Sequence, residues 1–353
     1  MSLQSWGWDD AWAARAEAAA AAGGAPARVV GQERDRWSIQ TSEGPTVARI
    51  GPGARLVGLP VVGDWVLAVP GPMPSDPWSV LALVPRRSSF SRGAAGTGGS
   101  EQVLAANVDV AWIVHGLDAP LNPRRLERYL AVAWESGALP EVVLTKADLA
   151  ADPGAVVAEA RALAVGVEVR LVSTSDPDSV AVLRAALRPG ATVVLLGPSG
   201  VGKSTLVNLL SQGERAATAP VREADRKGRH TTTRRELYRI PGGALLLDTP
   251  GIRELRVWSL DDGLGHAFPE IEELAGRCRF GDCRHEAEPG CAVLEAEAEG
   301  LLDPERLTSF RKLRAEAAYQ ARKTDALARQ AALSEHKAAL KTMKYHHKYR
   351  KPE

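Results

Sequence analysis

The segment 197–204, Gly-Pro-Ser-Gly-Val-Gly-Lys-Ser, constrains the fold more than any other part of the chain. An apolar run at 191–196 predicts a buried strand before it, and residues 205–210 predict a helix after it. In this context the glycines let backbone N–H groups wrap around phosphates, and the helix N-terminus adds its positive end. A chance glycine-rich turn is the weaker alternative. The predicted phosphate-binding residues are Gly197, Pro198, Ser199, Gly200, Val201, Gly202, Lys203, Ser204 and Thr205.

Within this loop, Lys203 is predicted to reach the β- and γ-phosphates of a nucleotide, and the Ser204 hydroxyl to ligate Mg²⁺. Upstream, an apolar strand at 142–144 leads into Thr145-Lys146-Ala147-Asp148. A carboxylate at Asp148 can accept hydrogen bonds from guanine N1–H and the exocyclic amine, whereas adenine offers no matching pair of donors. Alone, Lys-x-Asp would be a solvated turn; beside a phosphate loop it favours guanine over adenine.

Three further residues are predicted to lie near the base: Thr145, Ser173 and Thr174. Thr145 stands where GTPases usually have Asn, so one loop-bracing amide is absent, which predicts weaker nucleotide affinity without a change of base. Ser173 and Thr174 follow a predicted strand at 167–172. They fit a second guanine-contacting loop and a helix cap equally well.

Downstream of the phosphate loop, a strand at 244–247 ends in Asp248-Thr249-Pro250-Gly251. This is the switch II pattern, in which Asp248 holds Mg²⁺ through water and the Gly251 N–H meets the γ-phosphate. The polar segment 228–233 is predicted to be switch I, with Thr232 or Thr233 completing the Mg²⁺ shell. The base-reading turn precedes the phosphate loop, whereas ordinary GTPases have it last. The order of motifs therefore predicts a circularly permuted GTPase.

The position after this switch II motif is Ile252, where Ras-like proteins place a water-orienting Gln. An aliphatic side chain cannot hydrogen-bond the attacking water, so we expect slow intrinsic hydrolysis. His230 is the internal candidate for orienting that water; contact with RNA or capping of its loop are the alternatives. The predicted catalytic residues are thus His230, Lys203 and Asp248.

All three cysteines of the chain fall close together, with a histidine among them: Cys278, Cys283, His285 and Cys291. Three thiolates and one imidazole are the ligand set of tetrahedral structural Zn²⁺, with no position left open for water. Disulfides are the competing interpretation, but three cysteines cannot all pair, and no secretory signal indicates an oxidising compartment. One structural zinc ion is therefore predicted.

The permuted motif order, the run Gly-Arg-His-Thr-Thr-Thr at 228–233, the Asp-Thr-Pro-Gly motif and the cysteine cluster together resemble the ribosome small-subunit-dependent GTPase A family, RsgA, also called YjeQ. The resemblance covers roughly Ala27 to Ala318. It implies an N-terminal OB-fold, a central permuted GTPase and a C-terminal zinc domain. It also implies late maturation of the small ribosomal subunit as the function, with GTP hydrolysis stimulated by the subunit and coupled to release.

The expected fold is multidomain: an N-terminal β-barrel, a central α/β P-loop domain and an α-rich zinc-binding domain. Five short β-rich pieces between 27 and 84 fit an OB-fold slightly better than another small barrel. We expect an N-terminal helical extension at 1–25 that docks, binds a partner or stays mobile. Further boundaries are an OB-fold at 26–88, a linker at 89–106, the GTPase domain at 107–262, the zinc domain at 263–320 and a basic tail at 321–353.

Charge and composition bear on RNA contact, on membrane association and on the alternative functions. Residues 337–351 interleave basic and aromatic side chains, which suits rRNA contact, although a solvated tail is an equal alternative before the resemblance is considered. Arg86, Arg87 and Arg92 could contact RNA or belong to a simple hinge. No apolar stretch approaches the ~20 residues of a membrane span, and we expect a cytoplasmic monomer that binds GTP and GDP. An RNA-binding protein without hydrolysis, and an ATPase or kinase, are the minor alternatives.

Overall fold

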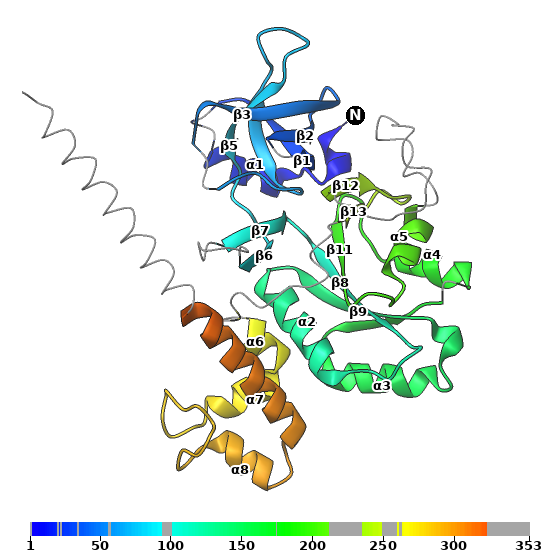
Figure 1. Ribbon diagram of the computed structural model, residues 1–353, viewed down its shortest axis with the longest axis vertical. Helices are drawn as coiled ribbons and strands as arrows, with labels where there is room; N and C mark the ends of the chain where they lie inside the picture. Colours follow the sequence, from blue (N-terminus) through cyan, green and yellow to red (C-terminus); the bar gives the residue numbers. More distant parts are fainter. Residues whose placement is uncertain are drawn as a thin grey trace, which may run out of the picture.

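The computed structural model describes residues 2–19, 21, 23–33, 35–55, 58–93, 101–173, 175–211, 235–248, 260 and 263–322. A β-barrel lies at the top of Figure 1, an α/β sheet in the middle and a helical unit at the bottom. Several predicted residues lie outside the described ranges: Thr174, His230, Thr232, Thr233, Gly251, Ile252 and the basic tail. Within the described ranges, no helix has the length and apolar character needed to span a membrane.

Five strands close the N-terminal barrel: β1 (Ala25–Glu33), β2 (Arg36–Gln40), β3 (Pro45–Arg55), β4 (Trp65–Val69) and β5 (Trp78–Leu83). They pair in the order β1-β2-β3-β5-β4, and β4 returns to β1. Inward-facing Val29, Trp37, Ile39 and Val66 are buried in one core, as expected from side chains that alternate across each strand. The predicted OB-fold is confirmed.

Six strands form the central sheet: β8 (Val110–Gly116), β9 (Leu139–Thr145), β10 (Glu168–Leu171), β11 (Thr192–Leu196), β12 (Arg235–Arg239) and β13 (Leu245–Asp248). Their order is β10-β9-β8-β11-β13-β12. All neighbours are parallel except β12 and β13. Every residue of β11 is buried, as its unbroken apolar run predicts for a central parallel strand. The carboxyl ends of β9, β11 and β13 therefore meet at one edge.

The helices of this domain are α2 (Pro123–Glu135), the 3₁₀ turn η3 (Ala147–Leu149), α3 (Pro153–Leu163), α4 (Pro177–Ala185) and α5 (Lys203–Ser211). Asn122, Asp152 and Asp176 cap α2, α3 and α4, and each is followed by proline in the first turn. The side-chain oxygens accept orphan N–H groups while proline fixes a helical φ, so each start is encoded locally.

The barrel and the central sheet are joined edge to edge. Strand β12 pairs with barrel strand β1, with Gly31 opposite Glu236 and Gln32 opposite Arg235. The two domains thus share one eleven-stranded sheet. The sequence places a strand at 236–240 but gives no sign of its partner, because pairing at a sheet edge between distant segments leaves no local pattern.

The N-terminal extension docks on the molecule. It consists of the 3₁₀ turn η1 (Leu3–Trp6) and a short helix α1 (Asp10–Glu17), whose N-cap Asp9 accepts a hydrogen bond from the Trp12 N–H at 2.8 Å. Trp12 is buried, and the Trp8 ring meets the barrel residue Trp65 edge-on at 4.7 Å between ring centroids. Docking, one of the three alternatives for this segment, is what the structure shows.

The segment 89–106, expected to be a linker, instead contains a hairpin of β6 (Ser89–Gly93) and β7 (Glu101–Ala106). The linker interpretation was wrong here because Phe90, from the Arg/Ser/Gly-rich stretch, and Leu104, which follows it, are both buried in the main core. Just before the hairpin, both Asp64 carboxylate oxygens accept hydrogen bonds from Arg86, at 2.8 and 2.7 Å. Arg87 lies 4.0 Å above the Trp12 ring. These two arginines brace the molecule internally.

The C-terminal unit comprises α6 (Gly263–Ala267), α7 (Pro269–Ala275), α8 (Ala292–Ala298) and the helical residues 304–322. Phe268, Ile271 and Phe310 form its buried centre, and the two phenylalanine rings meet edge-on at 5.6 Å. A buried polar cluster fixes this unit to α2. Glu127 on α2, 1% exposed, accepts a hydrogen bond from Arg306 Nη1 at 2.9 Å and another from Ser309.

Glu127→Ala should loosen this junction strongly. Among the described residues, removing the carboxylate leaves Arg306 buried with Glu270 as its one carboxylate partner. Breaking a buried pair typically costs about 3–5 kcal/mol. We expect amide hydrogen exchange across 304–322 to accelerate about 10²-fold or more when measured by mass spectrometry.

Arg128→Ala is the matched control for that substitution. Arg128, also on α2, pairs with Glu316 in the same helix 304–322, but both side chains are about one-third exposed. Such a pair contributes roughly 0–1 kcal/mol. Equal exchange rates in the two variants would show that the buried cluster does not hold the junction.

Candidate nucleotide site and metal-ligating cluster

The loop between β11 and α5 has the backbone that the glycine pattern predicts. Gly197, Gly200 and Gly202 have φ of +142°, +86° and +95°, a region that residues with a side chain rarely adopt. A Cβ added to Gly197 would lie 2.5 Å from the Val114 carbonyl oxygen, so the loop also approaches β8 closely. Lys203 is buried, and its Nζ donates to the Gly197 carbonyl at 2.6 Å and to the Pro198 carbonyl. Its ammonium group is thereby held inside the loop.

The predicted base-reading turn touches this loop directly. Lys146 follows β9 with φ of +57°, and its Nζ donates to the Gly200 carbonyl at 2.9 Å. The two groups belong to segments 54 residues apart in the sequence. Parallel pairing of β9, β8 and β11 accounts for the encounter, because both segments follow the carboxyl ends of strands in one sheet. A turn encoded before the phosphate loop is thus placed beside it.

Thr145, at the end of β9, fastens the turn to the phosphate loop. It is fully buried, and its Oγ1 donates to the Val201 carbonyl at 2.6 Å, with the His115 carbonyl at 3.3 Å. From the sequence, the missing Asn amide was expected to remove a brace. The structure shows that the threonine hydroxyl forms one, so the expected cause of weaker affinity is absent.

Thr145→Val tests this brace. Valine keeps the branched shape but leaves the Val201 carbonyl without its hydroxyl donor, a loss of about 1–3 kcal/mol for a buried acceptor. We expect the dissociation constant for a fluorescent GDP analogue to rise about 5- to 100-fold. Thr145→Ser, which keeps the hydroxyl, should stay near the wild-type value. If valine and serine bind GDP equally well, the hydroxyl does not position the loop.

The carboxylate predicted to read the base is oriented by a second loop. Asp148 lies in η3, and its Oδ1 accepts a hydrogen bond from the Ser173 hydroxyl at 2.5 Å. This bond lowers the pKa of Asp148 below its ordinary value, so the side chain stays an ionised acceptor. Ser173 therefore contacts the carboxylate that is predicted to read the base. The helix cap of α4 is Asp176 rather than Ser173. The Ser173 Oγ also accepts a hydrogen bond from the Ser175 N–H at 3.2 Å.

Two predicted Mg²⁺-associated residues are placed at the same edge. Ser204 is exposed in the first turn of α5, followed by exposed Thr205. Asp248 ends β13, which runs parallel to β11 with Leu247 opposite Val194. The Asp248 carboxylate thus lies at the end of the strand next to β11, which leads into the phosphate loop. These positions fit a hydrated Mg²⁺ bound to nucleotide phosphates.

Asp118 is a residue of the candidate site that the sequence analysis missed. It follows β8, and its Oδ2 accepts a hydrogen bond from Lys146 Nζ at 2.5 Å. That bond lowers the pKa of Asp118. The Lys146 ammonium is therefore held between a carboxylate and the Gly200 carbonyl. The available signal was its position just beyond the carboxyl end of a predicted parallel strand, where ligand-binding side chains gather.

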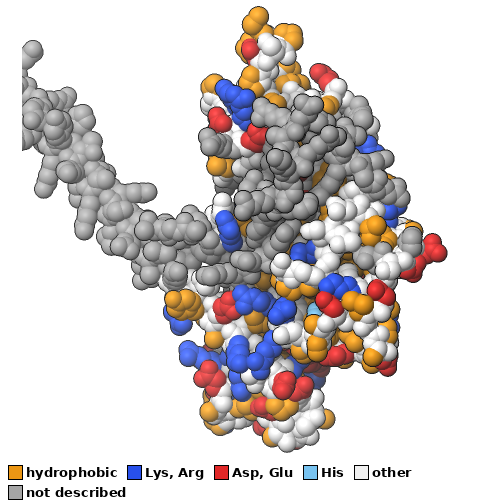
Figure 2. Space-filling model, turned by 45° about the vertical axis from the view of Figure 1, so that its right-hand side comes forward, with side chains coloured by type: hydrophobic (Ala, Val, Ile, Leu, Met, Phe, Trp, Pro, Cys, Tyr) orange, Lys and Arg blue, Asp and Glu red, His pale blue; other side chains and the backbone are white. Residues whose placement is uncertain are grey.

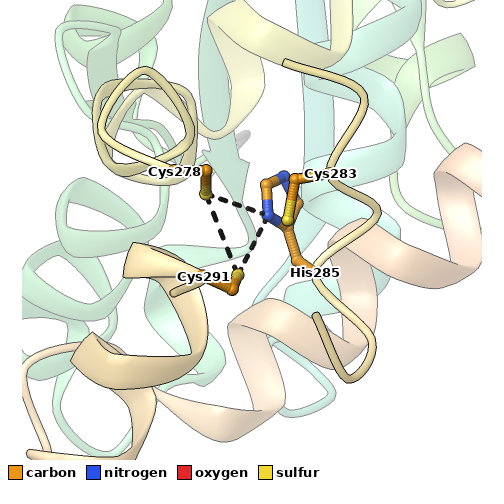
Figure 3. Close-up of side chains that lie close together, drawn as sticks. All are labelled: Cys278, Cys283, His285 and Cys291. Carbon is orange, nitrogen blue, oxygen red and sulfur yellow. Dashed lines mark hydrogen bonds between the residues drawn. The ribbon is translucent and has the colours of Figure 1, made fainter. Parts of the chain in front are cut away.

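The four predicted metal ligands converge in the C-terminal unit (Figure 3). The ligand atoms of Cys278, Cys283, His285 and Cys291 all lie within 4.8 Å of one another. Cys278 Sγ is 3.8 Å from Cys291 Sγ and 3.6 Å from His285 Nδ1, and the latter is 3.4 Å from Cys291 Sγ. Tetrahedral Zn²⁺ with Zn–S near 2.3 Å would separate two sulfurs by about 3.8 Å. All three thiols are free, and the donor set fits one closed tetrahedral metal site.

The loop carrying the histidine ligand is held by the neighbouring helix. His285 has φ of +58°, an uncommon backbone conformation for a residue with a side chain. Its carbonyl accepts a hydrogen bond from Arg311, and the carbonyl of Arg284 accepts one from Arg314. Both arginines lie within 304–322, the helix that also docks on α2. The metal cluster and the GTPase helix are thus linked through one element.

Comparison with known proteins agrees with this architecture. The family profile described as RsgA GTPase matches residues 83–258. Proteins named small ribosomal subunit biogenesis GTPase RsgA are 45% identical over 92% of this chain in Opitutus terrae and over 95% in Streptomyces coelicolor, covering 92% of each relative.

Two solved structures share the fold at 23% identity. YjeQ from Thermotoga maritima has a TM-score of 0.62, covering 83% of this chain and 98% of its own. YloQ, described as a circularly permuted GTPase, has a TM-score of 0.61, covering 84% and 96%. The fold and the order of the site motifs define a circularly permuted GTPase. Given the identity to curated relatives over nearly its full length, the chain belongs to the RsgA GTPase family.

Proposed function

We propose that this GTPase binds the small ribosomal subunit during its late maturation and couples hydrolysis of GTP to its own release. The observation that carries the proposal is 45% identity, over 92% of the chain, to a protein named small ribosomal subunit biogenesis GTPase RsgA. The site supports the guanine part of the proposal, because the Lys146 contact to Gly200 brings the base-reading turn to the phosphate loop. In this proposal the protein works in the cytoplasm, where ribosomal subunits mature.

We assign rRNA contact to the barrel and the metal-bearing unit. OB barrels commonly bind nucleic acid on one face. In the C-terminal unit, Arg277, Arg279 and Arg284 are exposed near the metal cluster. Figure 2 shows Lys and Arg side chains gathered over the lower part of the molecule, where Figure 1 places this unit. Positive charge of this kind suits contact with the phosphate backbone of RNA.

The ions proposed for the two sites follow from their donors. Zn²⁺ would be held by the three cysteines and His285, and it would supply folding energy rather than catalysis because no ligand position is left open. Mg²⁺ bound with GTP would neutralise phosphate charge, with Ser204, Asp248 and either Thr232 or Thr233 around it. We assign the orientation of the attacking water to His230, since Ile252 cannot hydrogen-bond it.

Release is proposed to depend on the link between the switch II region and the C-terminal unit. Asp248 ends β13, and α6 begins at Gly263, whose N–H donates to Glu135 Oε2 on α2 at 2.9 Å. Loss of γ-phosphate contacts in the intervening segment would therefore act close to the junction that positions the metal-bearing unit. Equal affinity of the GTP- and GDP-loaded forms for the small subunit would contradict this coupling.

The deciding experiment is GTP turnover with and without purified small subunits, using large subunits as the control. We expect slow turnover alone, strong stimulation by small subunits and none by large subunits. His230→Ala should bind GTP normally but lose the stimulation; retained stimulation would remove His230 from this role. Turnover that small subunits do not stimulate would overturn the proposed function. Effective competition by ATP against GTP would overturn the assignment of guanine as the base.

A further inference from the structure

A cavity of about 170 Å³ lies where the N-terminal extension, the barrel and the amino edge of the central sheet meet. This volume is more than ten times the roughly 10–15 Å³ that one water requires on the same measure. The side chains around it that carry the argument are Trp8, Trp12, Arg28, Arg87, Asn107 and Arg188. Thr192, which contacts Arg28, begins β11, whereas the phosphate loop follows the other end of that strand. The cavity is therefore separate from the nucleotide site.

Arg28 is the residue that indicates a ligand. It is 2% exposed, yet no carboxylate within the described residues pairs with it directly. Its Nη2 donates to the Thr192 hydroxyl at 3.0 Å and to the Asn107 carbonyl at 3.3 Å, while its Nε is buried without a hydrogen-bond partner. Burial lowers the pKa of Arg28 to about 10. Asp109 and Asp64 lie near enough to favour the charged form, but neither pairs with Arg28 directly. A buried guanidinium with an unused N–H donor and no directly paired carboxylate favours occupation of the adjoining space by an anion.

The charges of the other residues around the cavity also favour an anion. Three arginines, Arg28, Arg87 and Arg188, face two aspartates, Asp9 and Asp109, so the lining carries a net charge of +1. Both aspartates accept hydrogen bonds from backbone N–H groups, at 2.8 and 2.7 Å. Asp9 also forms an ion pair with Arg87 at 3.9 Å, so the excess positive charge lies on Arg28 and Arg188 against Asp109.

Stacking on tryptophan rings holds two of the arginines in place around the cavity. Arg87 lies 4.0 Å above the Trp12 ring, and Arg28 lies 4.9 Å above the Trp65 ring. Stacking of this kind fixes a guanidinium plane before any ligand arrives. Gly7 and Gly190 pack backbone to backbone at the same junction, since a Cβ on Gly7 would lie 2.6 Å from the Gly190 carbonyl oxygen. The extension is thus seated closely enough to complete the cavity wall.

We propose that this cavity binds a small phosphate-type oxyanion, either free phosphate or the phosphoryl group of a small phosphomonoester. Planar guanidinium groups match the geometry of phosphate oxygens and can contact two of them at once. Since the lining comes from the extension, the barrel and the central sheet, a bound anion would hold these three parts together. The proposal does not depend on ribosome binding.

Calorimetric titration of the full-length protein tests the site. The protein is first saturated with GDP and Mg²⁺, so that the phosphate loop is occupied, and ionic strength is held constant with chloride. We expect inorganic phosphate or glycerol 3-phosphate to bind saturably at one site per chain, and acetate to bind at least tenfold more weakly. The tighter of the two phosphate compounds identifies the source of the oxyanion. Acetate binding as tightly as phosphate, or no saturable phosphate binding, would overturn the proposal.

Three variants localise that binding. Arg188→Ala removes an exposed lining cation and should fold normally, and Arg28→Lys keeps a charge but loses the planar fork. Each should weaken phosphate binding at least tenfold, with folding checked by circular dichroism. Arg161→Ala removes an equally exposed arginine from α3, outside the cavity, and should bind as the wild type does. Wild-type phosphate affinity in Arg188→Ala would overturn the assignment even if Arg28→Lys failed to fold.

Discussion

Lys203→Ala is expected to lower GTP turnover by about 10²–10³-fold, measured as phosphate release at saturating GTP. Phosphoryl transfer to water depends on positioning and on neutralising charge, and removing one preorganised donor from such a site typically costs this much. Lys203 is suited to that role because it is buried at the start of α5 and its ammonium is held by the Gly197 and Pro198 carbonyls. The Lys203 ammonium group is therefore already positioned in the loop before the phosphates bind.

Lys312→Ala is the control for that loss. Lys312 is exposed on the helix 304–322 of the C-terminal unit, so its removal takes away the same charge far along the chain from the loop. We expect its turnover in the absence of ribosomal subunits to match the wild type. Turnover in Lys203→Ala within a few-fold of wild type would mean that the phosphates are not bound in this loop.

Cys291→Ser should abolish metal binding and unfold much of the C-terminal unit. Structural zinc sites of this donor type contribute about 10–16 kcal/mol in apparent terms, and a unit this small has little core to replace them. Cys291 also precedes α8 as its N-cap residue, so the loss reaches beyond the cluster loop. We expect zinc content to fall from one per chain to near zero by elemental analysis, with rapid amide exchange across 263–322.

The nucleotide-binding domain is expected to survive that substitution, because its sheet and phosphate loop take no side chain from the cluster. GDP affinity should stay within a few-fold of wild type. Asp282→Ala changes an exposed residue within the same loop and should keep its zinc. One zinc per chain in Cys291→Ser, with wild-type exchange, would show that the four residues do not form the metal site.

Local patterns in the sequence were sufficient to predict most of the elements of the fold. The continuous apolar run of β11 and the glycines after it identify a buried strand and a phosphate loop without further context. The same holds for the four predicted metal ligands, which lie within 14 positions of one another and converge as their chemistry predicts. In each case the residues that define the feature lie close together in the sequence.

The missed features depend on contacts between distant segments. The pairing of β12 with β1 joins residues about 200 positions apart, and nothing in either strand specifies the partner. The Arg306–Glu127 pair looks like two ordinary surface charges until packing buries both. The sequence indicates only that Thr145 lacks the usual Asn amide. The contact of its hydroxyl with the Val201 carbonyl is visible only in the folded loop.

The central claim is that Asp148 recognises the base of the nucleotide whose phosphates lie in the loop at Lys203. Competition binding of GDP and xanthosine diphosphate to Asp148→Asn tests it, with Asp178→Asn, an exposed residue of α4, as the control. The asparagine amide opposes the guanine amine but can donate to the carbonyl of xanthine. We predict that Asp148→Asn loses about 10²-fold in GDP affinity and prefers the xanthine nucleotide. Unchanged preference for GDP in Asp148→Asn would contradict the claim.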